Sequence, residues 1–155
     1  MKLCYPRGPS NGRKVAFLRE AFSREVPRGL KVRVKSNDKL SPAHAQKTKR
    51  GKWREVLIPQ IVDIASFAYA VHELLHVKMG HLDATDTVTT EYECERETIR
   101  VMKRYGIPME ARTLALMKKN VRDELDLWYK HDVIAPYEVR RWCGWVKPPL
   151  VEHRV

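Results

Sequence analysis

The chain has 155 residues, of which 43% are hydrophobic and 32% are charged, and its formal net charge is +11. This length and composition predict one globular domain over residues 1–155, without a run of about 20 apolar residues long enough to span a membrane. The first residues contain no apolar stretch of signal-peptide length. The three cysteines form neither a CxxC pair nor a disulfide framework. We therefore expect a cytoplasmic protein with reduced thiols.

The charge is unevenly distributed along the chain. Residues 1–54 contain 16 Lys and Arg against 3 acidic residues, whereas residues 55–111 contain 5 against 10. A strongly basic first third predicts a polyanionic partner, most commonly nucleic acid. The alternative is that this charge serves only to keep the protein in solution, and the sequence alone leaves both interpretations open.

The N-terminal part predicts one helix followed by two strands. Apolar residues at helical spacing predict a helix over residues 10–26, which Pro27 and Gly29 end. Alternating apolar and basic residues predict a strand over residues 30–35, and a polar loop is expected over residues 36–52. A second strand is predicted over residues 53–59 and should stop at Pro59. We expect the two strands to form a short antiparallel sheet.

The remainder of the chain predicts helices. The first covers residues 63–81, and a loop over residues 82–89 leads to a helix over residues 90–105, where Thr90 and Glu93 have the spacing of a capping box. Further helices are predicted over residues 109–130 and 136–142. The order of one helix, two strands and several helices predicts an α+β fold.

A metal-binding motif lies within the helix predicted over residues 63–81. His72 and His76 are four residues apart, so their imidazoles project from nearly the same side of a helix with 3.6 residues per turn. Both can reach one zinc ion at about 2.0–2.1 Å. Glu73 is offset by about 100° and has the position of the general base in the HExxH motif. The alternative is two surface histidines on an amphipathic helix.

A catalytic zinc ion requires a third protein ligand, and three residues are candidates. Glu91 and Glu93 open the next helix, which can return antiparallel to the first. Because Glu93 would also complete the capping box, Glu91 is the preferred ligand. His81 follows His76 by five residues and would require a sharp turn at Gly80. Glu95, one turn after Glu91, could orient a ligand histidine by a hydrogen bond.

These residues resemble a known family. The HELLH motif with the following Gly80-His81, together with the acidic stretch Glu91-Tyr92-Glu93-Cys94-Glu95, resembles the ImmA/IrrE family of zinc metallopeptidases over residues 53–108. The resemblance implies a small zincin-like domain with Zn²⁺ bound by His72, His76 and Glu91. It implies that Glu73 is the general base. It also implies a protein substrate, such as a transcriptional repressor or another regulatory protein. Cys94 and Glu95 replace the alanine and the asparagine or aspartate usual in that family.

The densest basic segment is a candidate nucleic-acid contact. It contains five cations around one aromatic residue, namely Lys47, Lys49, Arg50, Lys52, Trp53 and Arg54. The cations could bind phosphates while Trp53 stacks on a base. The alternative is a solvated loop in which Trp53 packs under the sheet.

The sequence is compatible with two other functions. The first is a SprT-like, DNA-associated metalloprotease, which would use a histidine as its third zinc ligand. The second is a metalloprotease-like protein without catalytic activity, which binds nucleic acid or a regulator. A peptidase would also need a hydrogen-bond donor for the oxyanion. The sequence does not choose among the candidate donors, which are Tyr69, Tyr92, His81 and His131.

Overall fold

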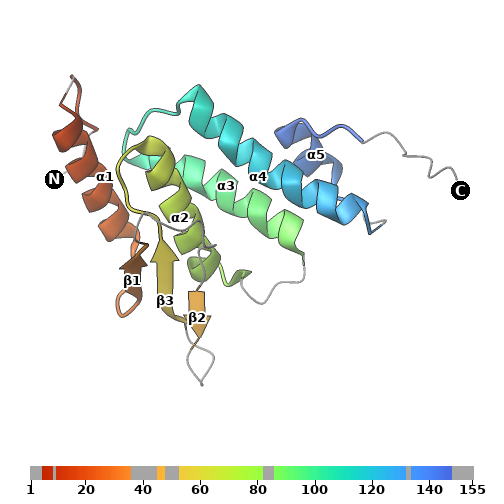
Figure 1. The fold of residues 1–155 in the computed structure, drawn as a ribbon, viewed down its shortest axis with the longest axis horizontal. Coiled ribbons are helices and arrows are strands. Elements are labelled where there is room, and N and C mark those ends of the chain that lie inside the picture. The colour runs from red at the N-terminus through yellow and green to blue at the C-terminus, as the bar shows by residue number, and fades with distance from the viewer. Residues whose placement is uncertain are drawn as a thin grey trace, which may run out of the picture.

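The computed structural model describes residues 5–8, 10–35, 45–47, 53–81, 86–131 and 134–147. Its elements, shown in Figure 1, are α1 (Asn11–Glu25), β1 (Lys31–Val34), β2 (Ala45–Lys47), β3 (Trp53–Ile58), α2 (Ile64–Lys78), α3 (Thr87–Arg104), α4 (Ala111–Tyr129) and α5 (Tyr137–Cys143). The predicted α+β class is confirmed, and each predicted helix is present with its ends shifted by a few residues. Among the described residues, no helix combines the length and the apolar character needed to cross a membrane.

The prediction of an antiparallel sheet is wrong for the two strands on which it was based. β1 pairs with β3 in parallel, with Val32 opposite Val56. The strand order is β1-β3-β2, because β2 forms an antiparallel pair with the other edge of β3. β2 lies inside the segment predicted as a loop, whose residues 36–44 and 48–52 lie outside the described residues. In the sequence, β2 comes between β1 and β3, so the chain changes direction once before β2 and once after it. As a result, β1 and β3 run in the same direction.

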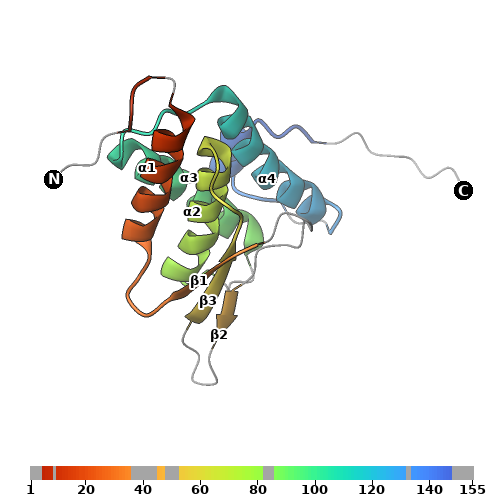
Figure 2. The ribbon, with the colours of Figure 1, turned by 60° about the vertical axis from the view of Figure 1, so that its left-hand side comes forward.

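The main core lies between the sheet and the helices α1 and α2. Val56 and Ile58 alternate with less buried neighbours along β3, so one face of this strand enters the core. Phe22 from α1 and Phe67 from α2 belong to the same buried cluster. Figure 2 shows α1 and α2 running beside each other next to the strands. One face of α2 is therefore packed against β3, and the opposite face of α2 packs against α3.

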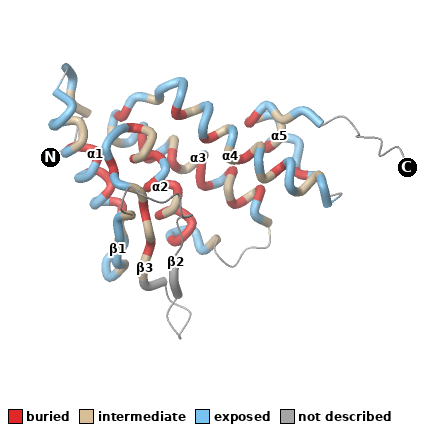
Figure 3. Tube along the Cα trace, viewed as in Figure 1, coloured by how far each residue is buried: buried red, intermediate tan, exposed pale blue. Residues whose placement is uncertain are grey.

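A second buried cluster joins α3, α4 and α5. Its buried members are Val88, Tyr92, Val121, Leu125, Ala135, Val139 and Cys143. Figure 3 shows buried stretches in α3 where it runs between α2 and α4. α3 is therefore packed on both sides, which holds its residues in a fixed position relative to α2.

Two N-terminal caps determine where α2 and α3 begin. At α2, the Asp63 side chain accepts a hydrogen bond from the Ser66 backbone N–H at 2.7 Å, and Ser66 Oγ accepts one from the Asp63 N–H at 3.0 Å. At α3, Asp86 accepts from the Thr89 N–H at 2.8 Å. The predicted capping box of Thr90 and Glu93 is wrong, because Asp86 starts the helix one turn earlier.

Candidate metal centre

The two histidines of the HExxH motif lie on the face of α2 that is turned toward α3. Leu74 and Leu75 occupy the face buried in the main core, whereas His72 and His76 face the acidic residues of α3. His76 pairs with Glu91, whereas His72, one turn earlier on α2, approaches Glu95, which lies one turn later on α3. α2 and α3 are therefore antiparallel, as the position of the acidic motif predicted.

Three side chains converge at this helix pair. The Nε2 atoms of His72 and His76 are 3.0 Å apart. The two carboxylate oxygens of Glu91 lie 2.9 Å from Nε2 of His72 and 3.0 Å from Nε2 of His76. Both histidines are buried, with exposed fractions of 4% and 8%. These three side chains form one of two groups in the described part of the chain whose donor atoms lie close enough to share a metal ion.

The geometry of this group fits zinc. Four tetrahedral donors at about 2.0–2.1 Å from an ion are about 3.4 Å from one another. The observed spacings of 2.9–3.0 Å are shorter by about 0.5 Å at most, so small side-chain rotations would admit the ion. Two imidazoles and one carboxylate form the ligand set of a catalytic zinc site, which leaves a fourth position open.

A second carboxylate lies behind His72. Oε1 of Glu95 is 3.3 Å from Nδ1 of His72, although the two groups are not aligned for a hydrogen bond. The same oxygen accepts a hydrogen bond from Nδ2 of Asn120 on α4 at 3.2 Å. Glu95 is 2% exposed, so this charge is held inside the protein. A carboxylate next to Nδ1 favours the tautomer with its proton on Nδ1 and a free lone pair on Nε2.

The electrostatics of the centre favour a bound cation. Burial by itself would lower the pKa of His72, but the hydrogen bond with Glu91 and the charges of Glu95 and Glu91 raise it to about 10. Burial would likewise raise the pKa of Glu91, yet the two histidines lower it to about 2. The surroundings of these side chains therefore favour a positive charge between the carboxylates, which a proton or a metal ion can supply.

Glu73 lies beside this group and is half-buried. Burial raises the pKa of its carboxyl and the charge of Glu91 raises it further, whereas His72, His76 and Lys35 act in the opposite direction. A raised pKa is the property expected of a carboxylate that accepts and then returns a proton.

His81 and Glu93, the two alternative ligands, do not join the group around Glu91. They pair with each other instead, since Nε2 of His81 lies 3.0 Å from a carboxylate oxygen of Glu93. Nδ1 of His81 lies 3.3 Å from Sγ of Cys94. Burial, followed by the charges of Glu91 and Glu95, raises the pKa of the Cys94 thiol well above its usual range. Cys94 is therefore not an activated nucleophile.

The candidate oxyanion donors occupy different environments. The ring of Tyr69 stacks on that of His72 with their centres 6.5 Å apart. The hydroxyl of Tyr92 accepts a hydrogen bond from Arg96, and its ring packs against Trp142 in the second buried cluster. His131 is exposed in the turn after α4. Tyr69 is therefore the tyrosine among the candidates that lies beside the centre.

The candidate nucleic-acid residues are described only in part. Lys47 ends β2, Trp53 begins β3 opposite it, and Arg54 follows. The structure places these three backbone positions on one hairpin and does not describe their side chains. Lys49, Arg50 and Lys52 lie outside the described residues. The role of this basic segment stays a prediction.

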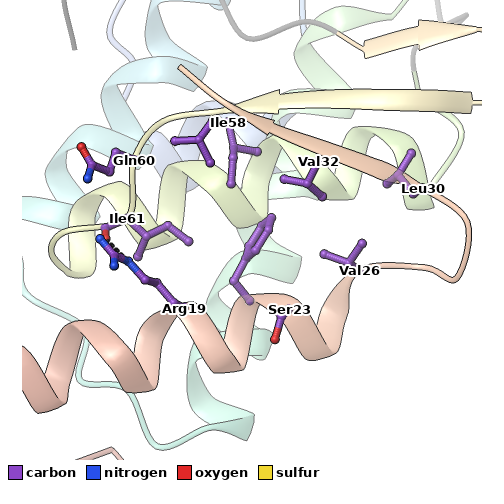
Figure 4. Close-up of a pocket in the computed structure, with 10 residues that line it drawn as sticks. Arg19, Ser23, Val26, Leu30, Val32, Ile58, Gln60 and Ile61 are labelled. Carbon is purple, nitrogen blue, oxygen red and sulfur yellow. Dashed lines mark hydrogen bonds between the residues drawn. The ribbon is translucent and has the colours of Figure 1, made fainter. Parts of the chain in front are cut away.

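Two pockets are relevant to the location of the site. The larger, of about 640 Å³, lies between α1 and the sheet (Figure 4), and Phe22, Val32 and Ile58 are among its mainly apolar lining residues. No metal-binding candidate lines it. A smaller pocket of about 210 Å³ between α2, α3 and α4 is lined by His72, Glu95 and Asn120. The chemistry of the donor atoms, rather than pocket size, identifies the site.

Sequence reasoning overlooked Asn120 and the contact between His81 and Cys94. A weak signal existed for Asn120, because it is a polar residue next to the buried positions Met117 and Val121 of an amphipathic helix. No comparable signal existed for Cys94, whose partner depends on how the chain turns after α2. Comparison of the chain with family models, with curated proteins and with solved structures gives no match.

Proposed function

We propose that this chain is a zinc-dependent peptidase in which His72, His76 and Glu91 bind the ion. The observation that carries the proposal is the approach of both Nε2 atoms to the Glu91 carboxylate, at 2.9 and 3.0 Å. Glu91 reaches them from a separate helix, so the donor set requires the tertiary fold. A chance pair of surface histidines would be exposed and would lack an acidic partner.

The roles of the residues follow from their positions. When bound, zinc supplies a Lewis acid that polarises the scissile carbonyl and lowers the pKa of a water molecule. Glu73 would accept a proton from a water molecule at the site and return it to the leaving amine. The charge of Glu95, 3.3 Å from Nδ1 of His72, would favour the tautomer with its proton on Nδ1, so that Nε2 presents its lone pair. Tyr69, beside His72, is the proposed donor to the oxyanion.

The proposal extends to the class of peptidase. The order of a helix carrying HExxH and an antiparallel helix carrying Glu91 agrees with the resemblance to the ImmA/IrrE family and with a zincin-like domain. We propose an intracellular regulatory protein as the substrate, for example a DNA-bound transcriptional repressor. The excess of 16 basic over 3 acidic residues in residues 1–54 supports a location near nucleic acid.

The geometry favours this class over the two alternatives. A SprT-like site would use a histidine as third ligand, but His81 lies outside the group formed by His72, His76 and Glu91. A purely structural metal site would need no carboxylate beside the ion in the position of a general base, whereas Glu73 lies beside this group. Structural zinc sites also use four protein ligands, whereas the group around Glu91 has three among the residues that the structure describes.

Two variants test the proposal. Zinc content would be measured by mass spectrometry for the purified wild type, Glu73→Gln and Glu91→Gln. Each protein would also be incubated with a library of proteome-derived peptides to detect new termini. We expect the wild type to bind zinc and cleave, Glu73→Gln to bind zinc without cleaving, and Glu91→Gln to lose zinc. Cleavage that persists in Glu73→Gln would contradict the assignment of the base, and a wild type without cleaved peptides would contradict peptidase activity.

A further inference from the structure

A second group of metal-binding side chains lies next to the first and has no role in the proposed reaction. It consists of His76, His81 and Cys94, whose donor atoms all lie within 4.8 Å of one another. Cys94 is fully buried on α3, three residues after Glu91. His81 follows α2 in the turn after Gly80. The two residues meet because the chain turns after α2 and α3 runs back beside it.

His81 is oriented in the same manner as a metal-binding histidine. Its Nε2 lies 3.0 Å from the carboxylate of Glu93, and its Nδ1 faces Sγ of Cys94 at 3.3 Å. A carboxylate on one ring nitrogen holds the proton there and leaves the lone pair of the other nitrogen pointing at the thiol. His72 has the corresponding arrangement in the first group, with Glu95 near one nitrogen and the metal position at the other.

His76 connects the two groups. Its Nε2 contacts Glu91 at 3.0 Å, and its ring centre lies 5.8 Å from that of His81. Four carboxylates, those of Glu73, Glu91, Glu93 and Glu95, act together on the Cys94 thiol. An excess of negative charge around two imidazoles and a thiol attracts a divalent cation.

We propose that His76, His81 and Cys94 form a second metal-binding subsite that takes a thiophilic divalent cation such as Zn²⁺ or Cd²⁺. The thiolate and imidazole donors match the preference of these ions for sulfur and nitrogen. The Cys94 proton is released to solvent when the thiolate binds the metal. The subsite shares His76 with the first group but differs from it in using a sulfur donor and in not requiring Glu91.

Cobalt distinguishes the two subsites because only a thiolate ligand produces an intense charge-transfer absorption in the near ultraviolet. The metal-free full-length chain would be titrated with Co²⁺ under reducing conditions. We expect the wild type to develop this absorption as cobalt is added. Cys94→Ala should abolish it, and Cys143→Ala should retain it, because Cys143 lies in the second buried cluster away from the metal groups.

Two further variants separate this inference from the proposed function and from misfolding. His81→Ala alters a half-buried residue outside the regular helices and should also abolish the absorption. Glu91→Gln removes a ligand of the first group only and should leave the absorption in place, whatever the fate of the peptidase activity. Far-ultraviolet circular dichroism would verify that each variant is folded. A wild type without the absorption, or an absorption that survives in Cys94→Ala, would overturn the proposal.

Discussion

Replacing Glu95 tests whether the carboxylate behind His72 supports metal binding. Oε1 of Glu95 is the oxygen that approaches Nδ1 of His72 at 3.3 Å, and Asn120 holds it at 3.2 Å. Glu95→Gln keeps the shape of the side chain and an oxygen that both neighbours can use, so it removes mainly the negative charge. Glu95→Ala removes the oxygen as well and leaves the amide of Asn120 without its acceptor.

The magnitude follows from this difference. Changes in residues that orient a metal-binding histidine cost about 10–100-fold in metal affinity. We assign the lower end, about tenfold or about 1.4 kcal/mol, to Glu95→Gln because the hydrogen-bonding shape is retained. We assign the upper end, about 100-fold, to Glu95→Ala, because the charge beside His72 is removed and the half-buried amide of Asn120 also loses its acceptor.

The assay is a competition for zinc between the protein and a chromophoric chelator. Glu97→Gln is the matched control, since Glu97 lies on the same helix but pairs with Arg100 and Arg104 on the outer side. We expect the control to bind zinc within about twofold of the wild type, because exposed ion pairs contribute little. The reasoning would be refuted if Glu95→Gln matched the wild type or if Glu97→Gln weakened binding equally.

Three further predictions concern stability. Burial alone would raise the pKa of Glu25, but hydrogen bonds from Lys78 and Tyr105 and the charges of Lys78 and Arg104 hold it below its usual 4.5. The ionised Glu25 should therefore stabilise the protein in full above about pH 4.5, and urea denaturation should show this stabilisation being lost as the pH falls through the lowered pKa. The difference in unfolding free energy between wild type and Glu25→Gln should therefore shrink in acid, and a constant difference would contradict the argument. Asp63→Ala should cost about 1 kcal/mol by removing the cap of α2, measured by thermal unfolding at pH 7. Zinc at about 100 times its dissociation constant should stabilise the wild type by about 2.7 kcal/mol and Glu91→Gln far less, as judged by the same unfolding curves.

The sequence predicted the elements that local patterns determine. Apolar residues at helical spacing located α2, and the four-residue separation of His72 and His76 placed both rings on one face of it. The choice of Glu91 as the third donor agrees with the observed contacts, although part of its basis was wrong. Glu93 does not cap α3, and its carboxylate is instead paired with the ring of His81.

The sequence could not predict features that depend on contacts between distant segments. β2 has only three residues in a polar stretch, and its pairing with β3 determines that β1 is parallel to β3. Asn120 on α4 forms a hydrogen bond with Glu95 on α3, although the two residues are 25 positions apart in the sequence. Such contacts depend on the packing angles of whole helices, which residue periodicity does not encode.

The most direct test of the metal centre is an anomalous difference map from crystals of the full chain grown with one equivalent of zinc. We expect a peak for the zinc ion at about 2.0–2.2 Å from Nε2 of His72, from Nε2 of His76 and from one carboxylate oxygen of Glu91. A peak bound by His72, His76 and His81 without Glu91, or the absence of any peak between His72 and His76, would contradict this assignment.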